Sequence, residues 1–195
     1  MSASFAQVLV AREEIETGVS RLGREIAETY RGVPGEVVLV GVLKGSAVFL
    51  ADLARAIPLD LTIDFISISS YGADASGSGV VRIVKDLEQD ISGKHVVVVE
   101  DIVDTGLTLT YLRKTLGARS PATLRTVTLI DKAARRLLPV PVEWRGFEAP
   151  DAFLLGYGLD YRGIYRNVPD LIAVPDVARL ALHPRSLVEE LYPSQ

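Results

Sequence analysis

Two neighbouring carboxylates, Glu100 and Asp101, stand at the end of an apolar run in which residues 96–99 are all valine. Four β-branched residues in succession are typical of a strand that is buried on both faces, as in a parallel sheet covered by helices. The chain continues with Asp104-Thr105-Gly106, which predicts a tight turn whose glycine takes a positive φ. Leucines at helical spacing follow, so we expect a helix to begin near Thr108.

This strand, turn and helix would present backbone N–H groups and threonine hydroxyls to an anion such as a phosphate group. Open parallel sheets bind ligands at the carboxyl ends of their strands, which is where this turn is expected to lie. The carboxylates of Glu100 and Asp101 would repel a phosphate unless they bind hydroxyl groups or a divalent cation instead. The pattern therefore predicts a ligand with a phosphate, a diol and a metal-bound polyphosphate, a layout that phosphoribosyl pyrophosphate has.

A second strand-to-helix turn offers another candidate anion site. The apolar run 37–43 predicts a buried strand, Lys44-Gly45-Ser46 predicts the turn, and a helix follows through Ile57. Taken alone, an ordinary turn with a surface lysine explains this stretch equally well. The other elements expected from the sequence are a helix over 13–30, strands over 61–68, 80–84 and 124–130, and a terminal helix and tail over 176–195.

Two stretches carry a resemblance to a known family. Residues 96–108 resemble the phosphoribosyl-pyrophosphate-binding motif of the type I phosphoribosyltransferases, and residues 151–161 are similar to the purine-side segment of the hypoxanthine–guanine enzymes of that family. The resemblance extends from about residue 8 to residue 174. It implies a single phosphoribosyltransferase domain over 1–195 with an α/β fold, in which a mostly parallel central sheet is flanked by helices. The core would span about 36–132, and a small hood subdomain would be formed by about 135–175 together with the N-terminal residues.

The resemblance also implies an activity in purine salvage, with Mg²⁺ as the cofactor. The 5-phosphoribosyl group would pass from phosphoribosyl pyrophosphate to hypoxanthine, guanine or both, giving the nucleoside monophosphate and pyrophosphate. Asp104 would be the general base that faces N7 of the purine, and Glu100, Asp101 and Asp160 would be the metal ligands. A non-proline cis peptide would precede Lys44. The residues implied to bind phosphoribosyl pyrophosphate are Lys44, Gly45, Glu100, Asp101, Asp104, Thr105, Gly106, Leu107, Thr108 and Arg166.

By the same resemblance, four residues would bind the purine. Lys132 would donate to the 6-oxo group, Phe153 would stack on the ring, and Leu154 would offer backbone groups to its edge. Asp160 would lie near the metal or the exocyclic group of the base. One of the two arginines at 135 and 136 would reach the pyrophosphate, but the sequence does not choose between them.

Residues 70–79 are small and polar, and they lie between two predicted strands. The stretch predicts a long hairpin tip that is mobile. Ser70 and Tyr71 resemble the start of the flexible hairpin lid in the hypoxanthine–guanine enzymes. We therefore expect these two residues to close over the pyrophosphate when both substrates are bound.

Composition limits the remaining classes of function. The 195 residues include no cysteine and carry a net charge of −4, so we expect a cytoplasmic protein that binds no nucleic acid. No apolar run is long enough to cross a bilayer, and the family leads us to expect a homodimer or homotetramer. Three alternatives stay open: a phosphoribosyltransferase for adenine, xanthine, orotate or uracil, a non-catalytic regulator that senses the sugar diphosphate and binds nucleic acid, and a plain nucleotide-binding domain.

The expected role of Lys132 leads to a prediction about substrate choice. An ammonium group can only donate hydrogen bonds, and adenine has an amino group where hypoxanthine has its 6-oxo group. Since a buried ammonium facing that amino group stays unpaired, kcat/KM with adenine should be about 10⁴-fold lower than with hypoxanthine. Steady-state assays with the two bases measure the ratio, and comparable values would contradict the assignment of Lys132.

Overall fold

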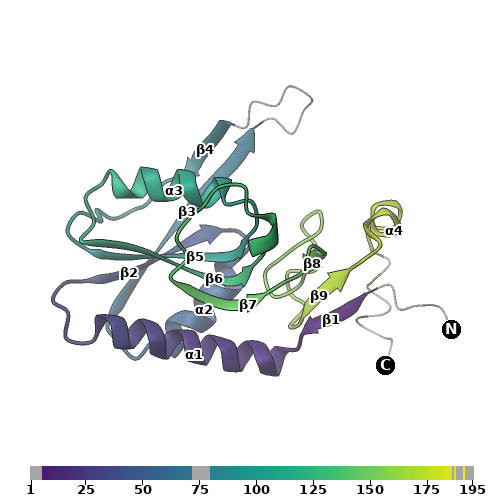
Figure 1. Ribbon diagram of the computed structural model, residues 1–195, viewed down its shortest axis with the longest axis horizontal. Coiled ribbons are helices and arrows are strands. Elements are labelled where there is room, and N and C mark those ends of the chain that lie inside the picture. The colour runs from purple at the N-terminus through teal and green to yellow at the C-terminus, as the bar shows by residue number, and fades with distance from the viewer. Residues whose placement is uncertain (1–5, 72–79, 186, 188–190, 192–195) are drawn as a thin grey trace.

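The computed structural model describes residues 6–71, 80–185, 187 and 191 of the chain, and it arranges them as two sheets with helices around the larger one (Figure 1). The elements in chain order are β1 (Gln7–Val10), α1 (Arg12–Tyr30), β2 (Val37–Leu43), α2 (Ser46–Ala56), β3 (Leu61–Tyr71), β4 (Val80–Lys85), β5 (His95–Val103), α3 (Leu107–Gly117), β6 (Thr123–Asp131), the 3₁₀ helix η1 (Ala133–Arg135), β7 (Trp144–Glu148), β8 (Phe153–Leu155), β9 (Leu171–Val174) and α4 (Val177–Leu182).

The larger sheet has six strands in the order β4-β3-β2-β5-β6-β7. Strands β3, β2, β5, β6 and β7 run parallel to their neighbours, and only β4 pairs in the antiparallel direction within this sheet as described. The mostly parallel α/β sheet expected from the sequence is confirmed. The chain passes from β2 through α2 to β3, and from β5 through α3 to β6, so the strand order reverses between β2 and β5. A crevice at the carboxyl ends of these two strands is the expected ligand site in such a sheet.

Strand β5 is buried on both faces, as its run of valines predicts. Val97 and Val99 pack in the cluster that includes α1 and α2, whereas Val96 and Val98 pack in the cluster that includes α3. Figure 1 shows α1 and α2 below the sheet and α3 above it. Because both faces of β5 are covered, the polar residues at its carboxyl end are the first that can reach a ligand.

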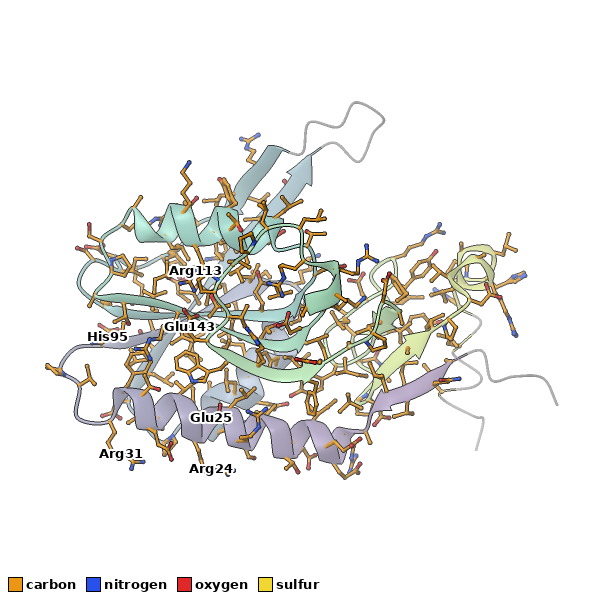
Figure 2. All side chains as sticks on the ribbon, viewed as in Figure 1. Arg24, Glu25, Arg31, His95, Arg113 and Glu143 are labelled. Atoms are coloured by element: carbon orange, nitrogen blue, oxygen red, sulfur yellow. The ribbon has the colours of Figure 1, made fainter. Side chains whose placement is uncertain are left out.

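A partly exposed ion pair fixes α3 against the sheet. Arg113 on α3 donates to Thr126 Oγ1 at 2.8 Å and lies 3.1 Å from Glu143 Oε2, and the two charged side chains point toward each other in Figure 2. Glu143 Oε2 also accepts from the backbone N–H of Thr126 at 2.7 Å. These contacts join α3 to β6, so the first turn of α3 has a fixed position over the carboxyl end of β5.

His95 lies at the other end of β5, away from the second sheet, where Figure 2 labels it. Its Nδ1 is 3.1 Å from Thr123 Oγ1 and its Nε2 is 3.1 Å from Pro34 O. Both ring nitrogens therefore have protein partners, and the histidine joins the amino ends of neighbouring strands.

The second sheet is antiparallel, with the order β1-β9-β8, and it stands beside the carboxyl edge of the first (Figure 1). It has an apolar core of its own, formed by Leu155, Tyr165, Val168, Ile172, Val174, Leu180 and Leu187. This sheet joins residues near the N-terminus to residues 153–174, the segments expected to form the hood.

Several elements differ from their expected bounds. β7 adds 144–148 to the larger sheet, beyond the expected end of the core near 132. Its sequence lacks a run of β-branched residues, and it forms because Trp144 and Phe147 pack against the core. β3 continues to Tyr71, since its pairing with β4 prolongs it. Within the stretch 176–195 expected to form a terminal helix and tail, α4 covers 177–182.

None of the described helices has the length and apolarity needed to cross a membrane.

The crossing of α1 over α2 predicts that one glycine cannot be replaced. A Cβ added to Gly23 would lie 2.4 Å from Ala56 O, whereas a Cβ added to Gly117 would meet only Leu124 Cδ2 at 3.8 Å. Gly23→Ala should therefore lower the free energy of unfolding by about 1–3 kcal/mol. Gly117→Ala, the matched control in α3, should leave it unchanged or raise it by up to about 1 kcal/mol. Chemical denaturation of both variants tests this, and equal effects would contradict the close packing at Gly23.

Candidate active site

A cavity of about 380 Å³ opens at the carboxyl ends of β2 and β5, where the strand order reverses. Of the residues expected to bind the sugar diphosphate, all but Lys44 and Leu107 line it. The lining residues are Val42, Leu43, Gly45, Ile68, Glu100, Asp101, Ile102, Val103, Asp104, Thr105, Gly106, Thr108, Leu109, Asp160 and Arg166.

The loop between β5 and α3 has the form expected of an anion cradle. Gly106 takes φ +84° and is followed at once by the first residue of α3, one position earlier than expected. No side chain caps this helix end, although Leu107 N lies 3.4 Å from Thr105 Oγ1. The N–H groups of the first turn can therefore bind an anion in the cavity. Leu107 itself is half exposed and could contribute only its backbone.

A neighbouring segment supports this loop from behind. The carbonyl oxygen of Thr105 accepts from the N–H groups of Leu137 and Leu138 at 3.0 and 3.2 Å. A Cβ on Gly106 would lie 2.8 Å from Leu138 O and 2.9 Å from Arg136 Cδ. Glycine is therefore required here both for its positive φ and for this close approach.

The acid pair lies in the cavity wall, where Glu100 is buried and Asp101 is half-buried. Glu100 is 5% exposed, and desolvation followed by the charge of Asp101 raises its pKa well above the usual range. Burial also raises the pKa of Asp101 to about 6, although a hydrogen bond from the N–H of Ile102 and the charge of Arg166 act in the opposite direction. Neither carboxylate forms an ion pair with a residue that the structure describes. The pair is thus costly to ionise in the free protein and would bind hydroxyl groups or a cation favourably.

Gly45 lies where three segments meet. The peptide bond between Leu43 and Lys44 is cis, and Gly45 follows it immediately. A Cβ on Gly45 would lie 1.6 Å from Asp101 Oδ2, and a Cβ on Gly158 would lie 2.1 Å from Gly45 O. The absence of a side chain at 45 therefore lets Asp101 approach the turn after β2, and the absence of one at 158 lets the loop after β8 approach the same turn. The Lys44 side chain is exposed and does not line the cavity.

Arg166 and Asp160 close the side of the cavity that belongs to the second sheet. Arg166 Nη2 lies 2.5 Å from Asp160 Oδ1, and its Nη1 donates to Gly158 O at 2.5 Å. Asp160 Oδ2 accepts from the N–H of Gly163 at 2.6 Å. Both oxygens of Asp160 are therefore occupied, and Arg166 brings a positive charge to the cavity wall.

The three residues expected to bind metal line the same cavity: Glu100, Asp101 and Asp160. Within the described part of the chain, however, no group of three histidine, cysteine or acidic side chains is arranged to hold a metal ion. A cation here would have to complete its coordination with oxygens of a ligand or water. Mg²⁺ commonly binds in this way, with one or two carboxylates and phosphate oxygens.

Of the four residues expected on the purine side, Asp160 lines the cavity, whereas Lys132, Phe153 and Leu154 do not. Lys132 follows β6 and is 5% exposed, and its Nζ donates to Ala152 O at 2.5 Å. Burial lowers the pKa of Lys132, while the charge of Asp104 raises it. Phe153 packs edge-on against Tyr161, with 5.7 Å between ring centroids, and Leu154 is buried in β8.

The two arginines that the sequence left open have separate partners. Arg135 Nε lies 2.8 Å from Asp104 Oδ1, at the cavity. Arg136 instead pairs with Asp131, which is 2% exposed at the end of β6 and also lies 3.1 Å from Arg145 Nε. Asp131 was not among the residues predicted from the sequence, although an acid at the carboxyl end of a buried strand could have indicated a residue of the site.

Ser70 and Tyr71 end β3, and the rest of the expected lid, 72–79, lies outside the described residues.

Comparisons with known proteins show which proteins this chain is similar to. A family model described as a phosphoribosyl transferase domain matches residues 9–162. The chain is 47% identical over 163 residues to the hypoxanthine phosphoribosyltransferase of Salmonella typhimurium, covering 84% of this chain and 92% of that protein. It is 47% identical over 165 residues to the hypoxanthine-guanine phosphoribosyltransferase of Mycobacterium avium, covering 83% and 81% of the two proteins.

Solved structures agree with these matches. A crystal structure of a hypoxanthine-guanine phosphoribosyltransferase from Bacillus anthracis superimposes with a TM-score of 0.81 at 43% identity, and the match covers 86% of this chain and 98% of that one. A structure of the hypoxanthine phosphoribosyltransferase of Trypanosoma cruzi gives a TM-score of 0.85 at 40% identity, covering 93% and 98%.

The buried acid pair leads to a prediction about pH and stability. The pKa of Asp101 is 3.8 in its usual range and about 6 in the folded chain, so the folded state binds more protons between these values. The stability that this proton contributes is full below about pH 3.8 and is lost as the pH rises through 6. Asp101→Asn should therefore be more stable relative to the wild type at pH 7.5 than at pH 4.5, by about 1–3 kcal/mol.

Denaturant titrations of the ligand-free wild type and variant at the two pH values measure this difference. Since both proteins share all other titrating groups, the comparison reports Asp101 together with its effect on the pKa of the neighbouring Glu100. A stability difference that is the same at pH 7.5 and pH 4.5 would show that Asp101 titrates normally.

Proposed function

The chain belongs to the phosphoribosyltransferase family, and on this premise we propose that it transfers the 5-phosphoribosyl group of phosphoribosyl pyrophosphate to hypoxanthine and/or guanine. The products are IMP or GMP and pyrophosphate, and the reaction serves purine salvage. The observation that carries this proposal is the cavity in which an uncapped helix N-terminus faces two buried carboxylates. A phosphate and a sugar diol are the ligand groups that match these two features.

The sugar diphosphate is bound along the wall formed by the turns after β2 and β5. Thr105, Gly106, Leu107 and Thr108 bind the 5-phosphate with backbone N–H groups and hydroxyls, which fixes the ribose. The carboxylates of Glu100 and Asp101 address the ribose hydroxyls. The pyrophosphate lies toward Lys44, Gly45 and Arg166. Of these three, Arg166 is supported most directly, because its guanidinium lies in the cavity wall.

The purine is bound between the end of β6 and the start of β8. Lys132 donates to the 6-oxo group, and the nearness of its Nζ to Ala152 O supports a donor aimed at this side of the site. Phe153 stacks on the ring, Leu154 supplies backbone groups, and Asp160 lies toward the exocyclic group or the metal. Both hypoxanthine and guanine have the 6-oxo group, so this contact accepts either base.

The transfer breaks the bond from C1 of the ribose to the pyrophosphate oxygen and forms a bond from C1 to N9 of the purine. Asp104 accepts the proton from N7 as N9 attacks, and this general base contributes about 10²–10⁴ to the rate. The sugar develops oxocarbenium character, and the negative charge of the acid pair stabilises it.

Mg²⁺ fits the donors of the acid pair, because Glu100 and Asp101 are buried carboxylates without a cationic partner in the described chain. When bound, the ion supplies positive charge that neutralises the pyrophosphate leaving group. Asp160, already held by Arg166 and Gly163, contributes by fixing the position of Arg166.

Further expectations from the sequence are part of the proposal. They are a cytoplasmic location, a homodimeric or homotetrameric assembly, no nucleic-acid or membrane partner, and a lid that begins at Ser70 and Tyr71. The net charge of −4 supports the absence of a general nucleic-acid surface. The expected assembly has a parallel in the solved structure of the Trypanosoma cruzi enzyme, which was studied for the role of its C-terminal region in the oligomeric state.

The experiment is turnover of the purified chain with phosphoribosyl pyrophosphate, Mg²⁺ and each purine base in turn. The wild type should form IMP or GMP, and no product from either base would overturn the proposed reaction. Asp104→Asn should lower kcat by about 10²–10⁴ while the KM for the sugar diphosphate changes little, because the amide keeps the shape but cannot accept the proton. Asp60→Asn, an exposed aspartate before β3, is the matched control. An Asp104→Asn variant with normal turnover would remove Asp104 from the role of base.

A further inference from the structure

Arg135 connects two carboxylates from different parts of the fold. It is the last residue of η1, the 3₁₀ helix that begins directly after Lys132, and its backbone N–H donates to Lys132 O at 2.9 Å. Its Nε lies 2.8 Å from Asp104 Oδ1, and its Nη1 donates to Asp151 Oδ1 at 2.6 Å. Asp104 belongs to the loop after β5, whereas Asp151 leads into β8. The planar guanidinium can span both because its donors point in different directions from one rigid group.

The contact with Asp104 leaves one carboxylate oxygen available. Oδ1 of Asp104 is buried and has no partner with hydrogen-bond geometry in the described chain, so its contact with Arg135 is an ion pair. The Asp104 side chain is nevertheless 38% exposed and lines the cavity. Since the exposed part cannot be Oδ1, the carboxylate is held with that oxygen inward and Oδ2 left for a ligand.

The charges of the four side chains around this ion pair cancel. Lys132 and Arg135 carry positive charges, and Asp104 and Asp151 carry negative ones. The hydrogen bond to Asp151 and the charge of Asp104 raise the pKa of Arg135, so the guanidinium stays protonated. Arg136, the neighbour of Arg135, takes no part, because it pairs with Asp131 on the other side of the segment.

We propose that Arg135 is a positioning residue for the transfer reaction, which holds Asp104 with Oδ2 toward N7 of the purine and links that orientation through Asp151 to the purine-side segment. The inference rests on the proposed function, because it assigns Asp104 the role of base. It also gives the two arginines distinct tasks: Arg135 orients the base at the cavity, and Arg136 holds the loop that supports the phosphate cradle.

Because the side chains of the Arg135–Asp104 ion pair are partly exposed, a positioning role and a structural role for Arg135 predict different effects on stability and on rate. Although Asp104 Oδ1 is buried, the side chains of Arg135 and Asp104 are 45% and 38% exposed as a whole, so the carboxylate can turn toward water when Arg135 is replaced. An ion pair between side chains this exposed contributes little to folding stability. A misdirected general base, however, slows the chemical step strongly, since a small displacement of a catalytic group is costly in rate. Loss of Arg135 should therefore appear in the rate of chemistry and not in the melting temperature.

The test compares Arg135→Gln with the wild type in single-turnover formation of IMP from saturating hypoxanthine and phosphoribosyl pyrophosphate. The single-turnover rate should fall by about 10–100-fold, while the KM values for both substrates change less than about threefold and the melting temperature is unchanged. Arg119→Gln is the matched control, because Arg119 also pairs with an aspartate, Asp86, at 2.9 Å but lies beyond the far end of α3. It should behave as the wild type.

A second test of the inference uses the variant Asp151→Asn. If Arg135 acts as a bridge, Asp151→Asn should reproduce part of the loss, and the double variant should be no slower than Arg135→Gln alone. Losses that multiply in the double variant, an unchanged single-turnover rate in Arg135→Gln, or an effect confined to KM would each overturn the inference. An inactive wild type would overturn the proposed function instead, so the two failures are distinguishable.

Discussion

The burial of Glu100 and Asp101 is the constraint around which the site is built. β5 is covered by helices on both faces, so its carboxyl end emerges from an apolar core directly into a narrow cavity. Two carboxylates placed there lose their hydration without gaining a cationic partner from the described chain, and burial raises the pKa of both. The free protein therefore carries an electrostatic cost that a ligand with hydroxyl groups or a bound cation can relieve.

The support of the phosphate cradle comes from outside the motif that forms it. Residues 133–140 contact the cradle through Thr105 O and the space left by Gly106, and Arg136 anchors that segment to the buried carboxylate of Asp131. Arg113 holds α3 to β6 on the other side. The three-residue loop between β5 and α3 is thus positioned by two ion pairs that the loop itself does not contain.

The parts of the structure that depend on local pattern could be predicted from the sequence. Four consecutive valines predicted the buried strand β5, and Asp104-Thr105-Gly106 predicted a turn whose glycine takes φ +84°. The family resemblance added the cis peptide before Lys44. What could not be predicted depends on distant pairings: β7 has no strand-like run and forms against β6, and the partners of Arg135 and Arg136 lie on other elements. Neighbouring arginines of identical chemistry differ only in the direction the backbone gives them.

The packing at Gly45 has a mechanical consequence. Gly45 O lies against Gly158 on the loop after β8, while the other side of Gly45 lies against the carboxylate of Asp101. The turn after β2 and the loop after β8 therefore contact each other closely, with no room for a side chain at Gly158. A rigid shift of the second sheet toward the first cannot be absorbed locally and must displace the turn after β2, and with it the Asp101 side chain. The position of the second sheet is therefore coupled to the acid pair, because any approach of the loop after β8 is transmitted through Gly45 to Asp101.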